Sequence, residues 1–315
     1  MEDFERRIEP FRTELLAYCY RMLGSVHDAE DLVQETYLRA WRAREQYDSS
    51  RSSVRTWLYR IATNVCLTAL EVRSRRPLPA GFVTASEPLD PFVRGETPWL
   101  QPLPDSYLGD PATTAIDRSS VRLAFAAALQ HLSARQRGAL ILRDVLGFSA
   151  AEAAAILGTT VVAVNSSLQR ARERLQGLGA DSDRGEPAES KQRAVVDRYM
   201  RAFEQADVEA LKRMLTADVI MEMPPMINWF SGPDNYGRFM HWVFEANGTD
   251  WHLDPIMANG QPGFAAYRLV GDRYQLHTVQ VFTVTADGIS RNSVFGDAEV
   301  FAAFGLPMEL SLPRS

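Results

Sequence analysis

Five polar side chains between residues 165 and 172 have the types and the spacing needed to contact nucleic acid. Apolar residues recur at Val164, Leu168, Ala171 and Leu175, which predicts a helix from Val161 to about Leu175. The opposite face of that helix carries Asn165, Ser166, Gln169, Arg170 and Arg172. Amides, hydroxyls and guanidinium groups hydrogen-bond to base edges and phosphates in a major groove. This face is therefore predicted to contact DNA, the alternative being an inert helical pair.

Two capping boxes place helices in front of this segment. In Ser133-Ala-Arg-Gln136 and Ser149-Ala-Ala-Glu152 the hydroxyl can accept from the third amide of a helix while the Gln or Glu reaches back. Gly158 then supplies a tight turn, and Thr160 can cap the helix that follows. The order helix, turn, helix is the spacing of a helix-turn-helix motif.

A second face with nucleic-acid character is predicted on a helix from near Ser53 to Arg73. Its inward residues are Leu58, Ile61, Ala62, Val65 and Ala69. Its outer face combines rings, arginines and small polar groups, of which the candidates for contact are Arg55, Trp57, Tyr59, Arg60 and Asn64. Bases stack on rings while guanidinium groups follow the phosphates of a single strand. Such mixtures also occur on inert surfaces.

A third face, on the segment from Asp28 to Arg42, has the character of a protein-docking surface. Ala29, Leu32, Val33, Thr36 and Ala40 form the inward face of the predicted helix. The outer face mixes polar and large apolar groups, namely Asp28, Asp31, Gln34, Glu35, Leu38 and Trp41. An ordinary solvated face is the alternative.

The charge of the chain is unevenly distributed, although 40 acidic and 34 basic residues sum to only −6 over its 315 residues. Residues 51–76 carry 6 basic and 1 acidic residue, and residues 118–178 carry 8 basic and 3 acidic, so each island is +5. Between them residues 77–117 hold 6 acids and 1 arginine, or −5. Contact with a polyanion is therefore expected from the first half alone.

Composition excludes several other classes of protein. The apolar stretches are too short for a membrane span and the acidic start lacks a signal-peptide profile, so a cytoplasmic protein is expected. Cys19 and Cys66, the only cysteines, have neither disulfide nor CxxC metal spacing. No metal and no cofactor is expected.

Proline and glycine divide the chain into three folded pieces. Eight of the 17 prolines lie between Arg76 and Pro111, which predicts an extended linker over residues 77–111. A Gly-rich polar tether is predicted over residues 178–187. The folded pieces are then residues 1–76 and 112–177, both all-α, and residues 188–315.

The last piece is predicted to be an α+β domain. A helix over Ser190–Gln205 comes first, and β-rich segments follow at Val219–Met223, Gly263–Leu269, Tyr274–Val284 and Ile289–Phe295. An acid or base for catalysis would have to come from Asp218, Glu222, His241, His252, Asp254 or His277, which form no recognisable motif. By alternation His277 shares a face with Val279 and Val281 and is expected to be structural. Methionines and aromatics from Met221 to Trp242 form either core or an apolar pocket.

With these motifs in hand, residues 1–177 resemble a bacterial sigma factor of the extracytoplasmic-function (ECF) type, in the sigma-70 family. Asp28 to Trp41 resembles region 2.2, Arg55 to Asn64 resembles regions 2.3 and 2.4, and Leu132–Arg137 with Asp144–Leu175 resembles region 4. The resemblance implies docking on the β′ clamp helices and β flap of core RNA polymerase. It also implies melting of the −10 promoter element with capture of a flipped base, and recognition of the −35 element by the helix after Thr160.

The rest of the chain also has family resemblances. Residues 188–315 resemble the SnoaL-like members of the NTF2-like superfamily, which have a cone-shaped fold, and the whole chain resembles the SigG-like and SigJ-like actinobacterial groups. In the family the linker threads the polymerase cleft, and Trp99 and Leu100 suggest that here it also docks on a folded surface.

We hypothesise that the last domain regulates the sigma part by intramolecular contact. No catalytic residue is assigned, and a small ligand or a separate anti-sigma factor stays open. Two alternatives remain: a DNA-binding protein whose last domain is an isomerase- or cyclase-type enzyme, and a helix-turn-helix repressor, which would have no use for a polymerase-docking helix.

Overall fold

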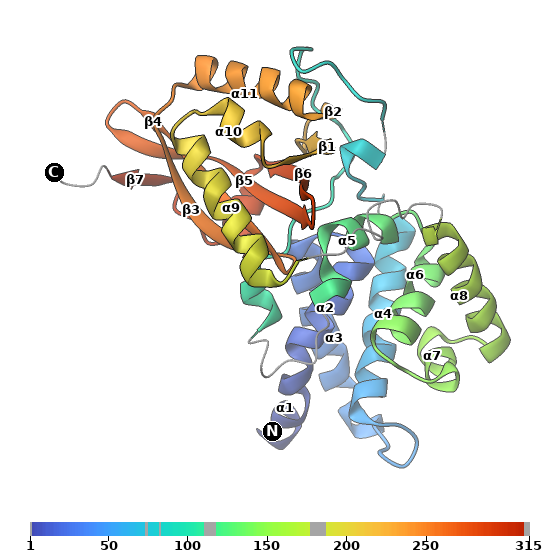
Figure 1. Ribbon diagram of the computed structural model, residues 1–315. Coiled ribbons are helices and arrows are strands. Elements are labelled where there is room, and N and C mark those ends of the chain that lie inside the picture. Colours follow the sequence, from blue (N-terminus) through green and yellow to red (C-terminus); the bar gives the residue numbers. More distant parts are fainter. Residues whose placement is uncertain (1, 73–74, 82, 110–117, 177–186, 312–315) are drawn as a thin grey trace. The chain divides into compact units, whose positions relative to one another are not determined.

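The computed structural model describes residues 2–72, 75–81, 83–109, 118–176 and 187–311 (Figure 1). The chain forms two compact units. Residues 1–76 and 105–180 make the first, which we call the helical unit, and residues 77–104 and 181–315 make the second, which we call the sheet unit. The predicted linker over residues 77–111 is thus divided between the two units at Pro104, and the predicted tether lies, except for Pro187, outside the described residues.

The helical unit is built from α-helices of 7 to 19 residues, as the helical periodicity predicts. Its α-helices are α1 (Glu2–Ile8), α2 (Arg12–Leu23), α3 (Val26–Arg42), α4 (Val54–Val72), α5 (Leu123–Leu129), α6 (Ala134–Leu140), α7 (Ala150–Leu157) and α8 (Val161–Gln176). Ser25 begins α3 by accepting from the amide of Asp28 at 3.3 Å. The five residues predicted to face inward on α3 are all buried.

Helix α2 forms the centre of the helical unit, since every residue from Leu15 to Leu23 is buried. The Tyr18 hydroxyl bonds the Thr63 hydroxyl of α4 at 2.8 Å. Arg21 donates to the carbonyl of Ser120 at 3.0 Å, and Arg137 of α6 donates to the carbonyl of Met22. Burial lowers the pKa of the Arg137 guanidinium to about 10. Buried guanidinium groups thereby tie residues 118–140 to the first four helices.

The helix-turn-helix motif is present as predicted. Both capping boxes are complete, at Ser133 with Gln136 and at Ser149 with Glu152. Gly158 ends α7 in the left-handed region at φ 60°, which glycine adopts without steric cost. Thr160 caps α8 by accepting from the amide of Ala163 at 3.2 Å. The axes of α7 and α8 differ by 96°.

The sheet unit combines α-helices with a seven-stranded mixed sheet, and the α+β prediction is confirmed. The elements after the tether are α9 (Glu189–Glu204), α10 (Val208–Lys212), β1 (Leu215–Glu222), β2 (Trp229–Ser231), α11 (Pro233–Asn247), β3 (Trp251–Ala258), β4 (Gln261–Val270), β5 (Arg273–Thr285), β6 (Gly288–Phe295), α12 (Ala298–Ala303) and β7 (Glu309–Ser311). The strand order is β2-β1-β6-β5-β4-β3, with β7 paired to β5. Only β1 and β6 are parallel within this order.

Helices α9, α10 and α11 cover one face of the curved sheet (Figure 1). The core between them is rich in aromatic residues, and Tyr199, Phe203, Phe264 and Phe282 stack there within 6.3 Å of one another in pairs. Strand β3 and helix α11 were not predicted. Pro255 interrupts the strand pattern and is tolerated because β3 is at the edge of the sheet. Gly237 lies within α11 and weakens the sequence pattern that would have predicted this helix. Because it has no Cβ, it leaves room for Lys212 and Val208 of α10.

Among the residues that the structure describes, no single helix is long and apolar enough to cross a membrane; only the bent pair α7 and α8 together has the required length and composition.

Candidate functional site

The predicted DNA-contacting face of α8 is open to solvent. Asn165, Gln169, Arg170 and Arg172 are exposed, and Ser166 is half-buried. Val164, Leu168 and Ala171 are buried beneath them, which fixes the direction of the polar face. Arg170 donates to the Ser166 hydroxyl at 2.7 Å, and Gln169 donates to Glu173 at 3.0 Å. These are contacts along one helix, so a nucleic acid can replace them without unfolding anything.

Arg172 differs from its neighbours because it is held by an acid. Its Nε and one terminal nitrogen donate to the two carboxylate oxygens of Asp144 at 2.9 and 2.7 Å. This bidentate pair aligns the Arg172 guanidinium, and the Asp144 carboxylate raises the pKa of Arg172 above its ordinary value. Asp144 precedes α7, so the pair also joins α8 to the turn before the motif.

The corresponding face of α4 is covered within the helical unit. Arg55 pairs with Glu14 of α2, with Nε 3.0 Å from Oε1, and donates to the carbonyl of Leu146 at 3.3 Å. Its guanidinium lies 4.3 Å from the centre of the Phe148 ring and 5.4 Å from that of Tyr59. The segment just before α7 thus packs on the face predicted to meet single-stranded DNA.

The prediction that Tyr59 is on the outer face of α4 is wrong for this structure. Tyr59 is fully buried, with edge-to-face contacts to Tyr18 and Phe148, both at 5.1 Å between ring centres. Thr56 and Thr63, which neighbour Tyr59 on the helix at spacings of three and four residues, are also buried. Periodicity divides a helix into one inner and one outer face, whereas α4 is packed by α2 on one side and by Phe148 on another.

The other residues predicted on α4 lie outside this cover. Arg60 and Asn64 are exposed. Trp57 is half-buried between Phe4 and Tyr47, with ring centres 6.1 and 5.0 Å away. The structure therefore brings Arg55 and Tyr59 together under Phe148 and leaves Arg60 and Asn64 accessible.

The predicted docking face of α3 is accessible over most of its length. Asp31, Gln34 and Leu38 are exposed, and Leu38 keeps 52% of its surface in solvent. Glu35 pairs with Arg39 one turn later at 2.7 Å. Trp41 is half-buried beneath the Arg44 guanidinium, which lies 4.5 Å from its ring. Asp28 differs, since it is half-buried and pairs with Arg76 at 3.0 Å.

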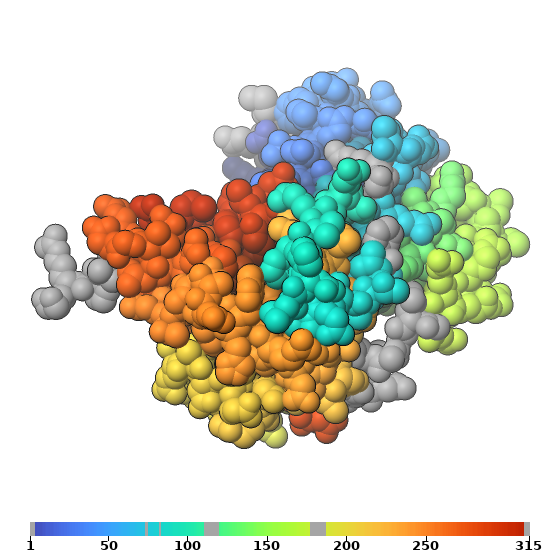
Figure 2. All heavy atoms as spheres, turned by 90° about the horizontal axis from the view of Figure 1, so that it is seen from above, coloured from blue at the N-terminus to red at the C-terminus, as the bar shows by residue number. Residues whose placement is uncertain are grey.

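Residues 77–104, which we call the docked linker, lie along the sheet unit with their backbone bonded to it (teal in Figure 2). The amide of Ser86 donates to the carbonyl of Trp229 at 2.8 Å, and that of Gly95 donates to Pro225 at 2.9 Å. In return the amide of Ile227 donates to Val93 and that of Asn259 donates to Leu103, both at 2.8 Å. A proline-rich segment without regular structure is thereby ordered by a partner surface.

Trp99 and Leu100 are buried in this contact. The Trp99 indole donates to the carbonyl of Pro225 at 3.0 Å, and Leu100 is fully buried. Gly95 lies against the indole so closely that a Cβ there would be 2.6 Å from Trp99 and 2.9 Å from Ile227. The turn of the linker onto the domain therefore requires glycine at position 95.

Three polar residues of the sheet unit that hold the docked linker were not predicted. Asn228 accepts from the amide of Val93 at 2.9 Å, and the Asn259 side chain accepts from that of Leu103 at 2.8 Å. Glu222 is fully buried and accepts from Ala80, Arg291 and Ser293. Asn259 adopts a left-handed φ of 57°, which asparagine tolerates better than most residues. A lone Asn or Glu in a strand-rich sequence carries no pattern that reveals such a role.

The sheet unit contains a cavity of about 440 Å³ that is walled mainly by methionine and aromatic side chains. Its walls include Phe92, Met221, Phe239, Met240, Trp242 and Trp251. The core alternative is met by Met221, Met223, Phe230, Phe239 and Met240, which are all buried in the core of the sheet unit. All of these except Phe230 also border this space, so the pocket alternative is met as well. A volume of this size is in the range of small-molecule sites.

His277 lines the cavity, and the prediction that it shares a face with Val279 and Val281 is wrong. Ala266 of β4 pairs with Thr278 and Tyr267 pairs with Leu276, so His277 is an extra residue at a register shift. The shift puts His277 with Thr278 and Gln280 on the cavity side, away from Val279 and Val281. Burial lowers the pKa of the imidazole to about 4, and the Arg268 charge adds to this, so the ring is neutral at pH 7.

The other predicted acid–base candidates do not gather at this cavity. His252 and Asp254 pair with each other at 3.0 Å on the exposed edge of β3. Asp218 and His241 are exposed, and Glu222 holds the linker. Among the described residues that line the cavity, no Asp or Glu is present. The arrangement supports binding better than acid–base chemistry.

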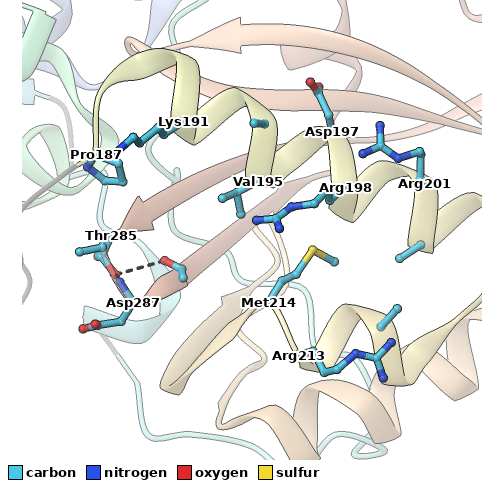
Figure 3. A pocket seen from close by; sticks show the side chains of 15 residues that line it. Pro187, Lys191, Val195, Asp197, Arg198, Arg201, Arg213, Met214, Thr285 and Asp287 are labelled. Carbon is cyan, nitrogen blue, oxygen red and sulfur yellow. Dashed lines mark hydrogen bonds between the residues drawn. The ribbon is translucent and has the colours of Figure 1, made fainter.

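A wider hollow of about 1270 Å³ lies between α9 and the turn before β6 (Figure 3). Four cationic side chains border it, from Lys191, Arg198, Arg201 and Arg213, together with Asp197 and Asp287. It is open and of mixed charge, and we assign it no ligand.

The two halves of the molecule match three described families. Residues 8–76 match Sigma-70 region 2, residues 122–175 match Sigma-70 region 4, and residues 196–292 match the SnoaL-like domain. With the helix-turn-helix motif and the α+β domain, these matches define a class: the chain belongs to the ECF sigma-70 family of RNA polymerase sigma factors, and carries a C-terminal SnoaL-like domain.

Relatives of known name match either nearly the whole chain or the sigma part alone. The chain is 49% identical to the ECF RNA polymerase sigma factor SigG of Mycobacterium tuberculosis, in an alignment that covers 98% of this chain and 85% of SigG. It is 31% identical to SigW of Bacillus subtilis over 56% of this chain and 88% of SigW. The crystal structure of SigJ of Mycobacterium tuberculosis superposes with a TM-score of 0.65 over 98% of this chain and 99% of SigJ at 24% identity, which shows a shared fold.

Proposed function

We propose that this sigma factor reads the −35 promoter element with α8, melts the −10 element with α4, and is held back by its SnoaL-like domain through the docked linker. The first two roles rest on the matched families and on the polar faces described above. We further propose that the exposed face of α3, from Asp31 to Trp41, docks on the polymerase β′ clamp helices, and that region 4 meets the β flap.

The observation that supports the regulatory role is the set of backbone bonds between residues 77–104 and the SnoaL-like domain. A segment whose amides and carbonyls are bonded to the domain is not available to thread a polymerase cleft at the same time. Docking and polymerase engagement therefore compete for the same residues, and release of the linker raises activity.

Run-off transcription with purified core polymerase on a panel of genomic promoters tests the proposal. We compare the full chain with Gly95→Val, which forces a side chain into Trp99, and with Val93→Ala, which trims an exposed linker side chain and keeps the backbone bonds. Gly95→Val should increase the transcript several-fold over the full chain, and Val93→Ala should not. An equal or smaller yield from Gly95→Val contradicts regulation by docking, and no transcript from any of the three contradicts the promoter roles.

No catalytic step is assigned to the SnoaL-like domain. The cavity lining described above offers a neutral imidazole and no carboxylate to work with it.

A further inference from the structure

We propose that the cavity in the SnoaL-like domain binds a neutral, mainly apolar ring compound with one hydrogen-bonding group, and that Phe92 of the docked linker is the lid of this site. The site and its lid stand on the geometry of the sheet unit. Only the consequence for transcription rests on the proposed function.

The walls determine the class of ligand. Indole, phenyl and thioether groups surround the space, and these surfaces favour flat apolar molecules. Arg94 is the only charged group among the described lining residues, and it is at the rim, where it is 68% exposed and pairs with Asp297 at 3.3 Å. A charged ligand would lose its hydration inside without gaining a partner, so a neutral one is favoured.

His277 gives the cavity its polar contact. Its ring packs edge-on against Trp251 at 5.5 Å between ring centres, and it forms no hydrogen bond with any residue that the structure describes. Gln280 beside it is already engaged, since its Oε1 accepts from Asn292 at 2.9 Å. The His277 ring is half-buried and borders the cavity, so a ligand carbonyl or hydroxyl inside it can form a hydrogen bond with the imidazole.

Phe92 closes the cavity from the linker side. Its ring lies 5.5 Å from that of Trp242 and 6.0 Å from that of Phe239, in tilted and edge-to-face contacts. The Asn228 side chain bonds the linker on both sides of Phe92, because it donates to the carbonyl of Pro91 at 3.2 Å and accepts from the amide of Val93 at 2.9 Å. This clamp directs the Phe92 ring into the opening.

Because Phe92 forms part of the wall, a bound ligand touches it only while the linker is docked. The ligand therefore binds the docked state more tightly, and by linkage it must strengthen docking by the same factor. In terms of the proposed function, such a compound keeps the sigma factor inactive.

Titration of the full chain with Nile red, a neutral fused-ring dye with one carbonyl, tests the site. We expect one saturable site with a blue-shifted, enhanced emission. Met240→Trp fills the cavity and should weaken binding at least tenfold, whereas Met308→Trp, at a position that is 55% exposed, should not. His277→Leu keeps the apolar volume and should weaken binding by up to about tenfold through loss of one hydrogen bond. Circular dichroism and thermal unfolding verify that each variant is folded.

Absence of saturable binding by the folded full chain, or equal binding by folded Met240→Trp, would overturn the site. If Met240→Trp does not fold, the His277→Leu result decides in its place. The lid is tested by hydrogen exchange at the amides of Val93 and Gly95, which should slow when the dye is bound. Unchanged or faster exchange would overturn the lid. None of these readouts uses transcription, so they stand or fall independently of the promoter assignment.

Discussion

The helices α8 and α4 carry comparable polar faces, yet the structure exposes the face of α8 and covers that of α4 around Arg55 and Tyr59. On α8 the guanidinium and amide groups reach solvent and contact only their own helix or Asp144. On α4 the Arg55 side chain is shared among Glu14, Leu146 and Phe148, and Tyr59 is buried beneath it.

The two faces therefore need different conditions to make the DNA contacts that we propose for them. The α8 face can meet a duplex as it stands. The α4 face can expose Tyr59 to a flipped base only after the segment around Phe148 moves away. The masking is internal to the helical unit, so it is separate from control by the linker.

The largest expected effect is that of Phe148→Ala. Loss of a buried phenyl ring should cost the helical unit about 3 kcal/mol in free energy of unfolding, while the affinity for a single strand of −10 sequence rises because Tyr59 and Arg55 are uncovered. Urea unfolding and fluorescence anisotropy measure the two quantities. Leu129→Ala on α5, also fully buried, is the control: it should destabilise without increasing strand affinity, and an increase there would show that loosening alone is sufficient.

The next largest effect is expected for a residue of α8 that we propose to recognise bases of the −35 element. Arg170→Ala should cost about 1–3 kcal/mol of discrimination between the −35 element and a scrambled duplex, because a bidentate contact to a base is lost. Competition binding with the two duplexes measures it, and Arg174→Ala on the same helix is the control. If Arg170→Ala weakens both duplexes equally, this residue holds phosphate and reads no base.

A smaller effect is expected from Glu14→Gln. The Arg55–Glu14 pair is partly buried, with 33% and 24% of the two side chains exposed, so its loss should change stability by roughly 1 kcal/mol. The freed Arg55 should at the same time raise affinity for the −10 strand, though less than Phe148→Ala does. Glu35→Gln, which breaks an exposed pair on α3, controls for the change of net charge. Lower strand affinity in Glu14→Gln would mean that Glu14 positions Arg55 for binding.

The smallest effect is predicted for Arg172→Ala. Its pair with Asp144 is exposed to solvent, so its loss should leave stability almost unchanged. As a phosphate contact it should lower the slope of log affinity against log salt by about one and leave sequence discrimination unchanged. Duplex binding at several salt concentrations gives that slope. A lost preference for the −35 element would move Arg172 to the base-reading group.

The sequence was sufficient for most of the helical elements because their signals are local. Capping boxes at Ser133 and Ser149 and a glycine at 158 mark helix ends whatever surrounds them, and all are present. The inward residues of α3 follow from spacing for the same reason. The burial of Tyr59 was beyond such reasoning, since it depends on Phe148, 89 residues later in the chain.

In the sheet unit, pairing between strands limited what could be predicted from the sequence. His277 was given the wrong face because alternation assumes an unbroken register, and the shift opposite Ala266 breaks it. The linker anchors Asn228, Asn259 and Glu222 are ordinary polar residues until the linker lies on them. Trp99 and Leu100 were predicted as contact residues from their apolar character in a proline-rich stretch, and the structure buries both.

The docked linker could also span a long distance once it is released from the SnoaL-like domain. Residues 77–104 are 28 residues, and an extended chain spans about 3.3 Å per residue, or roughly 90 Å in all. A DNA duplex rises 3.4 Å per base pair, so that length matches roughly 27 base pairs. Promoter elements named for positions −10 and −35 are 25 base pairs apart by their names. Releasing the linker from the SnoaL-like domain would thus add enough chain for the two parts that we propose to read DNA to reach both elements on one duplex.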